Sequence, residues 1–273
     1  MSKVEVGLTG AKETLLATLY GRALDARRSR PILGDTMSAD AVDRIDYDFG
    51  RMKVDARVAA SVAVRAKYFD TLTAAFLTQF DTATVVHLAA GLDTRVWRVA
   101  PRPGIHWYDV DFPEVIELRR RLFPSRDDYH LIGASVTDDG WLEAIPADRP
   151  TLILAEGLTM YLRPEAGHEL LRRLTSHFAE GTIAFDAFNS LGIRMQKLNP
   201  AVRGSGATLY WGIDDPRELE WVNPKLHLVE AVSALYEPGA AELPLSSRIF
   251  AKLVWPIPAF RTLGQYLRYE FTR

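Results

Sequence analysis

The chain has 273 residues, of which 48% are hydrophobic and 25% charged, a composition typical of one large folded domain and not of a disordered chain. With 33 basic and 35 acidic residues the formal charge is −2, so no general attraction to nucleic acid or to a membrane surface is expected, and we predict neither as a partner. The absence of cysteine excludes disulfides, thiolate metal sites and cysteine nucleophiles, and no apolar run is long enough for a signal peptide or a membrane span, so a soluble cytoplasmic protein is predicted.

The first eighty residues carry helical patterns. Apolar residues recur at helical spacing over 12–26 and again over 54–80. Pro31 and Gly34 mark a loop between these two segments. We therefore predict that residues 1–82 form a helical cap.

From Thr84 onward, short apolar runs alternate with helical patterns. Helices are predicted at 113–123 and 164–178, each of which opens with a proline near its first turn. Strands are predicted where the apolar runs are nearly continuous, as in a buried parallel sheet: TVVHLA, IHWYDV, HLIGA, TLILAE and TIAFDAF. This alternation predicts a doubly wound, Rossmann-like α/β sheet, with residues 83–188 as its core.

The alternation ends after Phe188. Residues 189–213 show no strand pattern and include the run Arg203-Gly204-Ser205-Gly206, so they are predicted to form an insertion or lid. LHLVEAVSAL and QYLRYEF then predict two late strands, which would end the sheet as an antiparallel pair. Residues 189–273 are thus expected to hold a lid and the last strands.

A turn of small residues follows the first strand, in VVHLAAGLDTR. Ala89 and Asp93 stand where a dinucleotide-binding loop would have glycines, and a carboxylate beside the loop repels phosphate but suits a cationic ligand. Asp111 follows Gly91 by twenty residues, which is the spacing of an acidic residue that accepts hydrogen bonds from ribose hydroxyls. The pattern favours a nucleoside without phosphates; the alternative is an ordinary strand-to-helix connection.

Glu156 stands at the carboxyl end of the fourth predicted strand, where side chains of a Rossmann-like sheet face the ligand crevice. The alternative is a salt bridge at a strand end. Histidines give no comparable signal: His87 lies within an apolar strand, as a core histidine does, and His168-Glu169 is followed by Arg172 where a zinc motif needs its second histidine. No metal is predicted.

Three blocks resemble the signature blocks of the leucine carboxyl methyltransferase family: VVHLAAGLDTRVWR, WYDVDFPEVIELRR and LILAEGLTMYLRPE. The bacterial branch of that family, typified by a polyketide O-methyltransferase, is also similar in TLLATLYGRALDARRSRPILGD, VRAKYFD, YWGIDDPRELEW and LRYEF, so the resemblance covers nearly the whole chain. It implies a seven-stranded class I methyltransferase sheet, S-adenosylmethionine as the cofactor, and a single methyltransferase domain over residues 1–273.

The resemblance also implies cofactor contacts. Arg65, in VRAKYFD, corresponds to the arginine that pairs with the methionyl carboxylate, and a guanidinium suits this role because it holds a carboxylate through two hydrogen bonds. Gly91 corresponds to the loop glycine beside the amino-acid part of the cofactor, and Asp111 to the ribose acceptor. Glu156 corresponds to the glutamate near the amino acid and the reactive methyl group.

Two positions depart from the family pattern. Ser135-Val136 stand where the family has an aspartate that contacts the adenine amino group and a backbone N–H that contacts the ring; a hydroxyl accepts the same hydrogen bond without charge. Ala89 replaces the glycine that the family has before the Ala-Gly pair, and its methyl group is expected to tighten the approach to the cofactor.

Acceptor-side residues are predicted from their positions. Tyr161 follows the fourth strand closely enough to line the acceptor pocket, Tyr20 and Arg22 would reach it from the cap, and Tyr210 or Trp211 from the lid. An aromatic, partly basic pocket suits a planar polyketide or an aryl carboxylate. The alternative for each aromatic residue is packing in the core. No catalytic residue is assigned.

The sequence therefore predicts a methyltransferase acting on an oxygen of a small, polyketide-like metabolite. In-line methyl transfer depends mainly on positioning, which contributes about 7–11 kcal/mol. A carboxyl oxygen, with a pKa near ~4, is ionised at neutral pH, whereas a phenol near ~10 needs a base, and the sequence leaves both open. Two other classes remain: a noncatalytic nucleoside-binding or interaction protein, and a nicotinamide-dependent dehydrogenase, which the missing loop glycines disfavour. The oligomeric state is not predicted.

Overall fold

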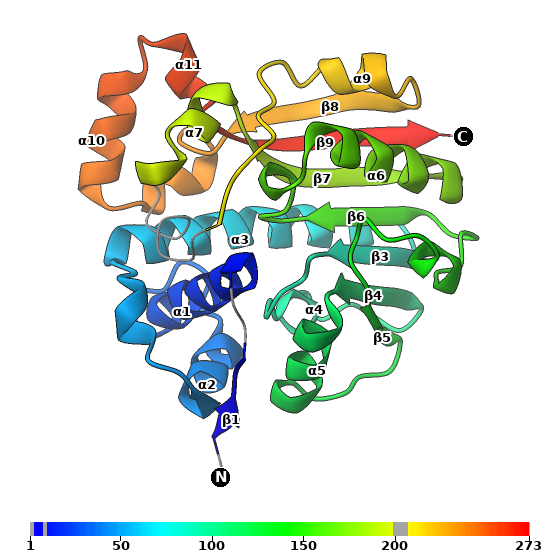
Figure 1. The fold of residues 1–273 in the computed structure, drawn as a ribbon, viewed down its shortest axis with the longest axis horizontal. Helices are drawn as coiled ribbons and strands as arrows, with labels where there is room; N and C mark the ends of the chain where they lie inside the picture. Colours follow the sequence, from blue (N-terminus) through cyan, green and yellow to red (C-terminus); the bar gives the residue numbers. More distant parts are fainter. Residues whose placement is uncertain (1–2, 8–9, 199–206, 273) are drawn as a thin grey trace.

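The computed structural model describes residues 3–7, 10–198 and 207–272. Seven strands form one sheet in the order β5-β4-β3-β6-β7-β9-β8 (Figure 1). β9 is antiparallel to both of its neighbours, and the strands from β5 to β7 pair in parallel. The strands are β3 Ala83–Leu88, β4 Ile105–Asp111, β5 Tyr129–Gly133, β6 Thr151–Ala155, β7 Glu180–Phe188, β8 Leu226–Ser233 and β9 Gly264–Thr272. The predicted α/β sheet and its final antiparallel pair are confirmed.

Helices cover both faces of this sheet. On one face Leu171 of α6 packs in the same cluster as Val86, and on the other face Phe69 of α3 packs in the same cluster as Val85. Val85 and Val86 belong to different clusters because successive side chains of a strand point to opposite faces. The helices of this part of the chain are α3 Ala56–Leu77, α4 Arg95–Val99, α5 Pro113–Leu122, α6 Pro164–His177 and α9 Glu218–Val222. The two predicted crossover helices are α5 and α6.

The helical cap is built from α1 (Thr14–Ala26), α2 (Thr36–Arg44) and the first half of α3. The sequence reasoning missed α2. This helix begins where the Asp35 carboxylate accepts a hydrogen bond from the Ser38 N–H at 3.1 Å, which satisfies a donor that helix geometry leaves free. Leu19 of α1 packs with Leu118 of α5, so the cap is anchored to the sheet layer. Two short parallel strands, β1 Val4–Glu5 and β2 Ile45–Asp46, pair beside it.

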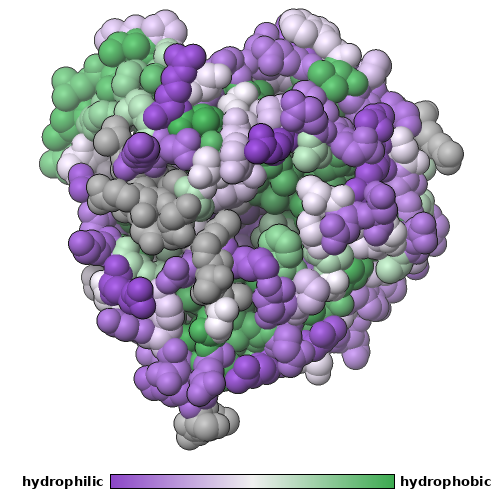
Figure 2. All heavy atoms as spheres, viewed as in Figure 1, coloured by the Kyte–Doolittle hydropathy of each residue, from purple (hydrophilic) through white to green (hydrophobic). Residues whose placement is uncertain are grey.

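The chain after β7 holds more helix than predicted. The expected lid contains α7 (Ser190–Arg194) and a 3₁₀ turn over Gln196–Leu198, while the run 203–206 lies outside the described residues. α10 (Leu245–Val254) and α11 (Pro258–Arg261) form an unpredicted pair of helices between β8 and β9. Figure 2 shows apolar side chains gathered on the corner of the molecule that α10 forms. None of the described helices is long and apolar enough to cross a membrane.

Candidate active site

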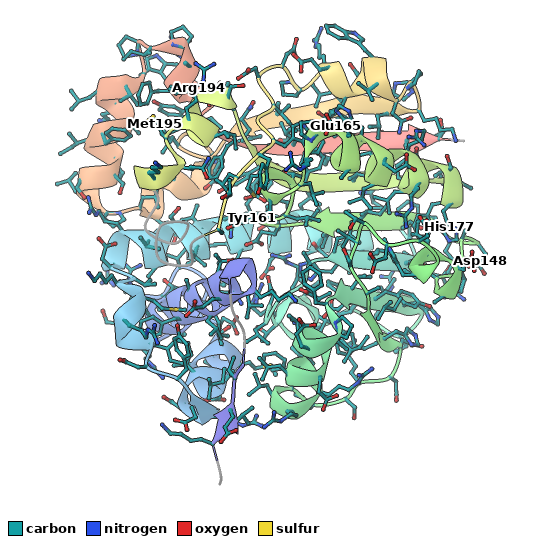
Figure 3. All side chains as sticks on the ribbon, in the orientation of Figure 1. Asp148, Tyr161, Glu165, His177, Arg194 and Met195 are labelled. Atoms are coloured by element: carbon teal, nitrogen blue, oxygen red, sulfur yellow. The ribbon has the colours of Figure 1, made fainter. Side chains whose placement is uncertain are left out.

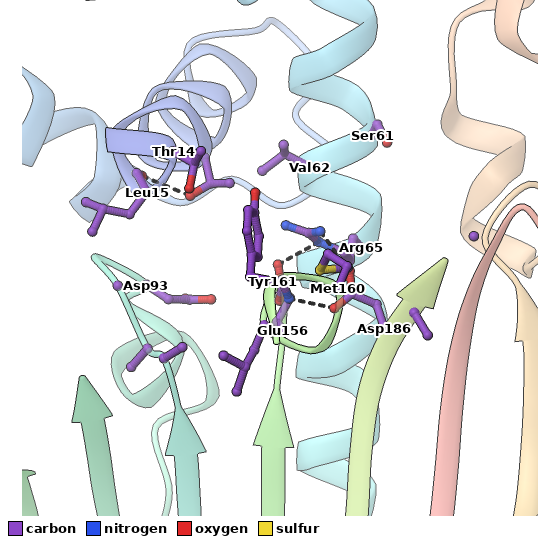
Figure 4. A pocket seen from close by; sticks show the side chains of 18 of the residues that line it. Thr14, Leu15, Ser61, Val62, Arg65, Asp93, Glu156, Met160, Tyr161 and Asp186 are labelled. Carbon is purple, nitrogen blue, oxygen red and sulfur yellow. Dashed lines mark hydrogen bonds and ion pairs between the residues drawn. The ribbon is translucent and has the colours of Figure 1, made fainter. Parts of the chain in front are cut away.

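A cavity of about 540 Å³ lies at the carboxyl ends of the parallel strands, below the helical cap (Figure 4). The strand order places β4 and β3 at one end of this cavity, β6 in the middle, and β7 and β9 at the other end. Ligands of open α/β sheets bind at such a position, where the order of strands reverses. The lining includes Ala89, Gly91, Asp93 and Asp111 at the β3–β4 end, Arg65 and Glu156 in the middle, and Phe188, Gln265 and Tyr266 at the β7–β9 end.

The loop after β3 takes a conformation that favours glycine. Gly91 has φ +52°, and a Cβ atom added to it would lie 3.4 Å from the Cβ atom of Leu15 on α1. Ala89 has φ +48°, although left-handed backbone costs a non-glycine residue about 1–2 kcal/mol. The departure at Ala89 therefore strains the loop backbone beside the cavity.

Asp111 binds this loop from the end of β4. Its Oδ2 accepts a hydrogen bond from the Gly91 N–H at 2.7 Å, and its Oδ1 accepts one from the Phe112 N–H at 2.7 Å. Burial raises the pKa of Asp111, although these two hydrogen bonds oppose the shift. A carboxylate has about four acceptor sites, so sites remain for the hydroxyls of a ribose.

The segment after β5 lies beside Asp111, because the Ala134 N–H donates to the Asp111 carbonyl oxygen at 2.9 Å. Ser135 and Val136 follow directly, but neither is among the residues that line the cavity. Val136 is buried in the core, and the Ser135 hydroxyl lies 2.8 Å from the Thr137 hydroxyl. Their contacts to an adenine ring stay a prediction.

Arg65 and Glu156 meet in the middle of the cavity. Arg65 donates from Nε to Glu156 Oε1 at 2.9 Å and from Nη1 to Asp186 Oδ2 at 2.9 Å (Figure 4). Burial alone would raise the pKa of Glu156, but Arg65 and Arg95 outweigh it, so the pKa lies below its ordinary value. The pair thus presents a cation and an anion to the same part of the cavity.

Arg95 does not line the cavity, but it holds the lining residue Glu156, and the sequence reasoning missed it. Its side chain is fully buried at 0% exposure, and it donates to Glu156 Oε2 at 2.5 Å and to Asp70 Oδ1 at 2.7 Å. Burial would raise the pKa of Asp93, but Arg95 and Arg98 hold it well below its usual range. Asp93 is therefore an ionised partner of arginines. Nothing in the sequence distinguished Arg95 from the solvent-exposed arginines.

Asp186 was also missed, although a signal for it exists. It lies near the carboxyl end of β7. Side chains at this end of a strand face the ligand crevice, and Glu156 on β6 was identified on the same ground. Its Oδ1 accepts a hydrogen bond from the Gly157 N–H at 2.5 Å, while its Oδ2 accepts from Arg65. Burial raises the pKa of Asp186, although Arg65 opposes the shift. Asp186 thus fixes the orientation of Arg65.

The predicted acceptor-side residues divide into two groups. Tyr161 lines the cavity, and Figures 3 and 4 show it between the cap and the sheet. Arg22 also lines it, but its buried guanidinium donates to the Leu92 carbonyl at 3.0 Å and to the Ser38 hydroxyl at 3.2 Å. We conclude that Arg22 joins the cap to the β3 loop and has little capacity left for a substrate.

The other three predicted positions are not among the residues that line the cavity. Tyr20 stacks on Phe49 inside the cap, with ring centroids 5.2 Å apart. Trp211 is buried against α6, where its indole leaves no room for a Cβ atom at Gly167. Tyr210 is 46% exposed and lies under the Arg163 guanidinium. Packing explains Tyr20 and Trp211, which was the alternative for aromatic residues.

Apolar side chains dominate the β7–β9 end. They come from α3, from the turn after β6, from the end of β7, from the predicted lid and from the residue after β8: Val58, Val62, Met160, Phe188, Leu209 and Ala234. Burial raises the pKa of Tyr161 and of Tyr266, so both phenols stay protonated at neutral pH.

His87 lies on β3, with Nε2 3.2 Å from Arg95 and Nδ1 3.4 Å from Asp109. His87 is thus buried with a partner on each ring nitrogen, as predicted for a core histidine, although it also belongs to the cavity lining.

These residues fit an adenosine joined to an amino acid. Asp111 has acceptor sites left for ribose hydroxyls, and Arg65 beside Glu156 offers complementary charges to a zwitterion. The loop at Gly91 lets a ligand approach its backbone closely. No group of three or more metal-ligating side chains occurs in the described ranges. A seven-stranded sheet with this site defines an S-adenosylmethionine-dependent methyltransferase.

The comparisons with known proteins agree. The model of the leucine carboxyl methyltransferase family matches residues 15–175, and the chain belongs to that family. It is 44% identical to the tetracenomycin polyketide synthesis O-methyltransferase TcmP of Streptomyces glaucescens, over 97% of this chain and 98% of that one. It is 39% identical to the S-adenosyl-L-methionine-dependent methyltransferase dpfgK of Gibberella zeae, over 87% of each chain.

A solved structure supports the fold. A candidate methyltransferase from Thermobifida fusca YX superposes with a TM-score of 0.61 over 94% of both chains, at 17% identity. The family decides between the functional classes that the sequence left open. The chain is a methyltransferase and an enzyme, and the dehydrogenase and noncatalytic alternatives are set aside.

Proposed function

We propose that this methyltransferase forms a methyl ester on the carboxylate of a small aromatic, polyketide-like acid. The observation that carries the proposal is the β7–β9 end of the cavity, which is apolar and offers no free base among the described residues. A phenol needs a base to become a nucleophile at neutral pH, whereas a carboxylate does not. The name of TcmP, which refers to a polyketide, supports the polyketide-like class of acceptor.

The titratable groups nearest this end are all engaged or protonated. The two oxygens of Asp186 accept hydrogen bonds from Gly157 and Arg65. Glu156 is held between Arg65 and Arg95. The phenols of Tyr161 and Tyr266 have raised pKa values, so neither is a phenolate that takes up a proton.

The cofactor supplies an electrophilic methyl group on a sulfonium ion. We assign Arg65 and Glu156 to its amino-acid part, Gly91 and Asp111 to the adjoining nucleoside, and Ser135 and Val136 to the adenine. Ala89 shapes the loop backbone at this position, and Asp93 pairs with Arg95, which in turn holds Glu156. We further propose that residues 1–82, 83–188 and 189–273 act together as one methyltransferase domain.

The apolar lining favours this reaction on electrostatic grounds. With the cofactor bound, a carboxylate anion would take the methyl group as the carbon–sulfur bond broke, and the anionic and cationic reacting groups would become a neutral ester and a neutral thioether. Water stabilises the separated charges more than the neutral products, so an apolar site lowers the barrier. Val62, Met160 and Phe188 surround the acceptor end, and they exclude water while they hold an aromatic ring.

The test uses acceptors that present the same aromatic skeleton with either a carboxyl or a phenolic oxygen. Methyl-labelled cofactor should transfer its label to the acid, and mild alkali should release that label because a methyl ester hydrolyses and an aryl methyl ether does not. The rate should stay level above about pH 5, since the acid is then ionised. A rate that rises tenfold per pH unit towards pH ~10, with an alkali-stable product, would identify a phenol acceptor and overturn the proposal.

A further inference from the structure

Six large apolar side chains are exposed on the segment between β8 and β9. Their exposed fractions run from 46% for Phe250 to 72% for Leu253. We call this set the α10 patch, and it consists of Leu245, Ile249, Phe250, Leu253, Trp255 and Ile257. Soluble proteins seldom leave a contiguous apolar set of this kind uncovered, so the α10 patch indicates an interaction surface (Figure 2).

The helix itself is apolar on two faces. Ala251 and Val254 are buried towards the protein, and the Tyr236 hydroxyl donates to the Ala251 carbonyl oxygen. Leu245, Ile249 and Leu253 recur every four residues on the outer face. The buried face holds the helix in place, which leaves the outer face free to contact a second surface.

The patch is also cationic. Arg248 and Lys252 are exposed on α10, and neither forms an ion pair within the described part of the chain. The sequence contains no aspartate or glutamate from Leu243 to Tyr269. The formal charge of −2 for the whole chain therefore conceals one region where apolar and unpaired basic side chains alternate.

Exposed apolar side chains beside unpaired basic ones indicate which kind of partner the α10 patch binds. A second copy of the chain, seated on the patch about a twofold axis, would bring the basic residues of both copies to one interface, and the sequence from Leu243 to Tyr269 supplies no carboxylate to pair them. An anionic bilayer surface offers phosphates to the cations and an apolar layer to the leucines and Trp255. Interfacial helices share this make-up of basic, aliphatic and tryptophan side chains. We propose that the α10 patch docks the enzyme on the surface of membranes that contain anionic lipid.

Docking at this corner would orient the active site. The segment leaves β8 beside Ala234 and returns to the sheet at Gly264, and both residues line the β7–β9 end of the cavity. The Asn189 amide donates to the Ala259 carbonyl at 2.7 Å and so ties the segment to the start of the predicted lid. An apolar aromatic acid dissolved in the bilayer would then lie near the acceptor end. This consequence rests on the proposed function, whereas the docking itself does not.

The experiment measures co-sedimentation of the full chain with vesicles of phosphatidylcholine, with and without phosphatidylglycerol. We expect binding to the anionic vesicles only. Replacing both basic residues, as Arg248→Gln with Lys252→Gln, should weaken that binding about thirtyfold, because each cation near an anionic surface contributes roughly a factor of five. Leu245→Ser with Leu253→Ser should abolish it. Trp221→Ser on α9, which removes an apolar side chain exposed at 74%, is the matched control and should bind as the parent does.

Other results would overturn docking. Equal binding to neutral and anionic vesicles would show that the basic residues do not contribute, and no binding to either would remove the proposal. Light scattering adds a second measurement: a dimer that the Leu245→Ser, Leu253→Ser variant converts to monomer would assign the patch to a second copy. Cofactor affinity and the circular dichroism spectrum confirm that each variant is folded. Methyl transfer to a soluble acceptor should be unchanged, so a failure of docking is distinguishable from a failure of the proposed function.

Discussion

The two ends of the cavity differ in the polarity of their lining. In the middle, where β6 and β7 end, two arginines and two carboxylates are joined by short ion pairs: Arg65, Arg95, Glu156 and Asp186. Towards β7 and β9 the lining is apolar and its tyrosines are protonated. The charged half is suited to hold a zwitterion and a nucleoside in one position, and the apolar half to accept a ring system and to exclude water.

The charged half and the apolar half therefore contribute differently to binding and to reactivity. A buried ion pair is expensive to form, but breaking one leaves an uncompensated charge, so such a network fixes geometry strictly. An apolar wall discriminates weakly between related rings, since one methylene changes binding by about 1–3 kcal/mol. Cofactor recognition is therefore expected to tolerate less change than acceptor recognition.

The largest effect is expected at the centre of the charged half. Arg95→Met keeps much of the side-chain volume but leaves Glu156, Asp70 and Asp93 without their common cation, which should lower the free energy of unfolding by about 3–5 kcal/mol. Urea unfolding measures this change. Arg57→Met, which breaks an exposed pair with Asp55, is the control and should cost less than about 1 kcal/mol. Equal losses for the two variants would mean that the buried network does not stabilise the fold.

The next effect concerns the cofactor. Arg65→Met should weaken binding of S-adenosylhomocysteine about 10- to 100-fold in isothermal titration, because a charge-assisted hydrogen bond contributes roughly 1.5–3 kcal/mol. Lys67→Met is the control on the same helix, since Lys67 pairs with Glu242 outside this cavity. If Arg65→Met binds as tightly as the Lys67→Met control, Arg65 serves the network alone and does not contact the carboxylate.

A smaller effect should appear as a pH dependence. Burial raises the pKa of Asp111, so its carboxylate is protonated at a pH where an ordinary aspartate, with a pKa of ~3.9, is still ionised. Loss of the acceptor should weaken S-adenosylhomocysteine binding as the pH falls towards this raised pKa, at a pH above that at which an ordinary aspartate is protonated, while Asp111→Asn should bind weakly and without this slope. The free energy of unfolding should depend on pH in the opposite direction to cofactor binding. A carboxyl group whose pKa is raised in the folded state stabilises that state at low pH and destabilises it as the pH rises. Parallel binding curves for the two proteins would exclude the ribose contact.

Much of the charged half was predictable because its residues stand at strand ends. Glu156 and Asp111 follow apolar runs whose carboxyl ends must meet at one edge of the sheet, and Asp186 obeys the same rule although it was missed. Arg95 was not predictable, because its burial depends on Asp70 from α3 and Glu156 from β6, which come together only in the fold. A local sequence pattern does not indicate contacts between residues that are distant in the chain.

The apolar half was harder to predict. Its walls come from α3, the turn after β6, β7 and the start of β9, and no local pattern assigns an aliphatic residue to a cavity instead of a core. Trp211 shows the ambiguity, because it stands near Leu209 in sequence but packs against Gly167. α10 was missed although its sequence is clearly amphipathic, so a local signal for this helix did exist.

The smallest predicted effect tests strain at the charged half. Ala89→Gly relieves a left-handed backbone that costs about 1–2 kcal/mol, and it adds unfolded-state entropy that costs about 0.4–1 kcal/mol, so the free energy of unfolding should rise by about 0.5–1 kcal/mol. Ala90→Gly is the matched control: Ala90 is buried without a positive φ, and the same change there should destabilise the protein by about 1 kcal/mol. The two neighbours should therefore shift the urea midpoint in opposite directions. Shifts of the same sign would mean that the loop holds no strain, and that Ala89 differs from the family glycine only by the volume of one methyl group.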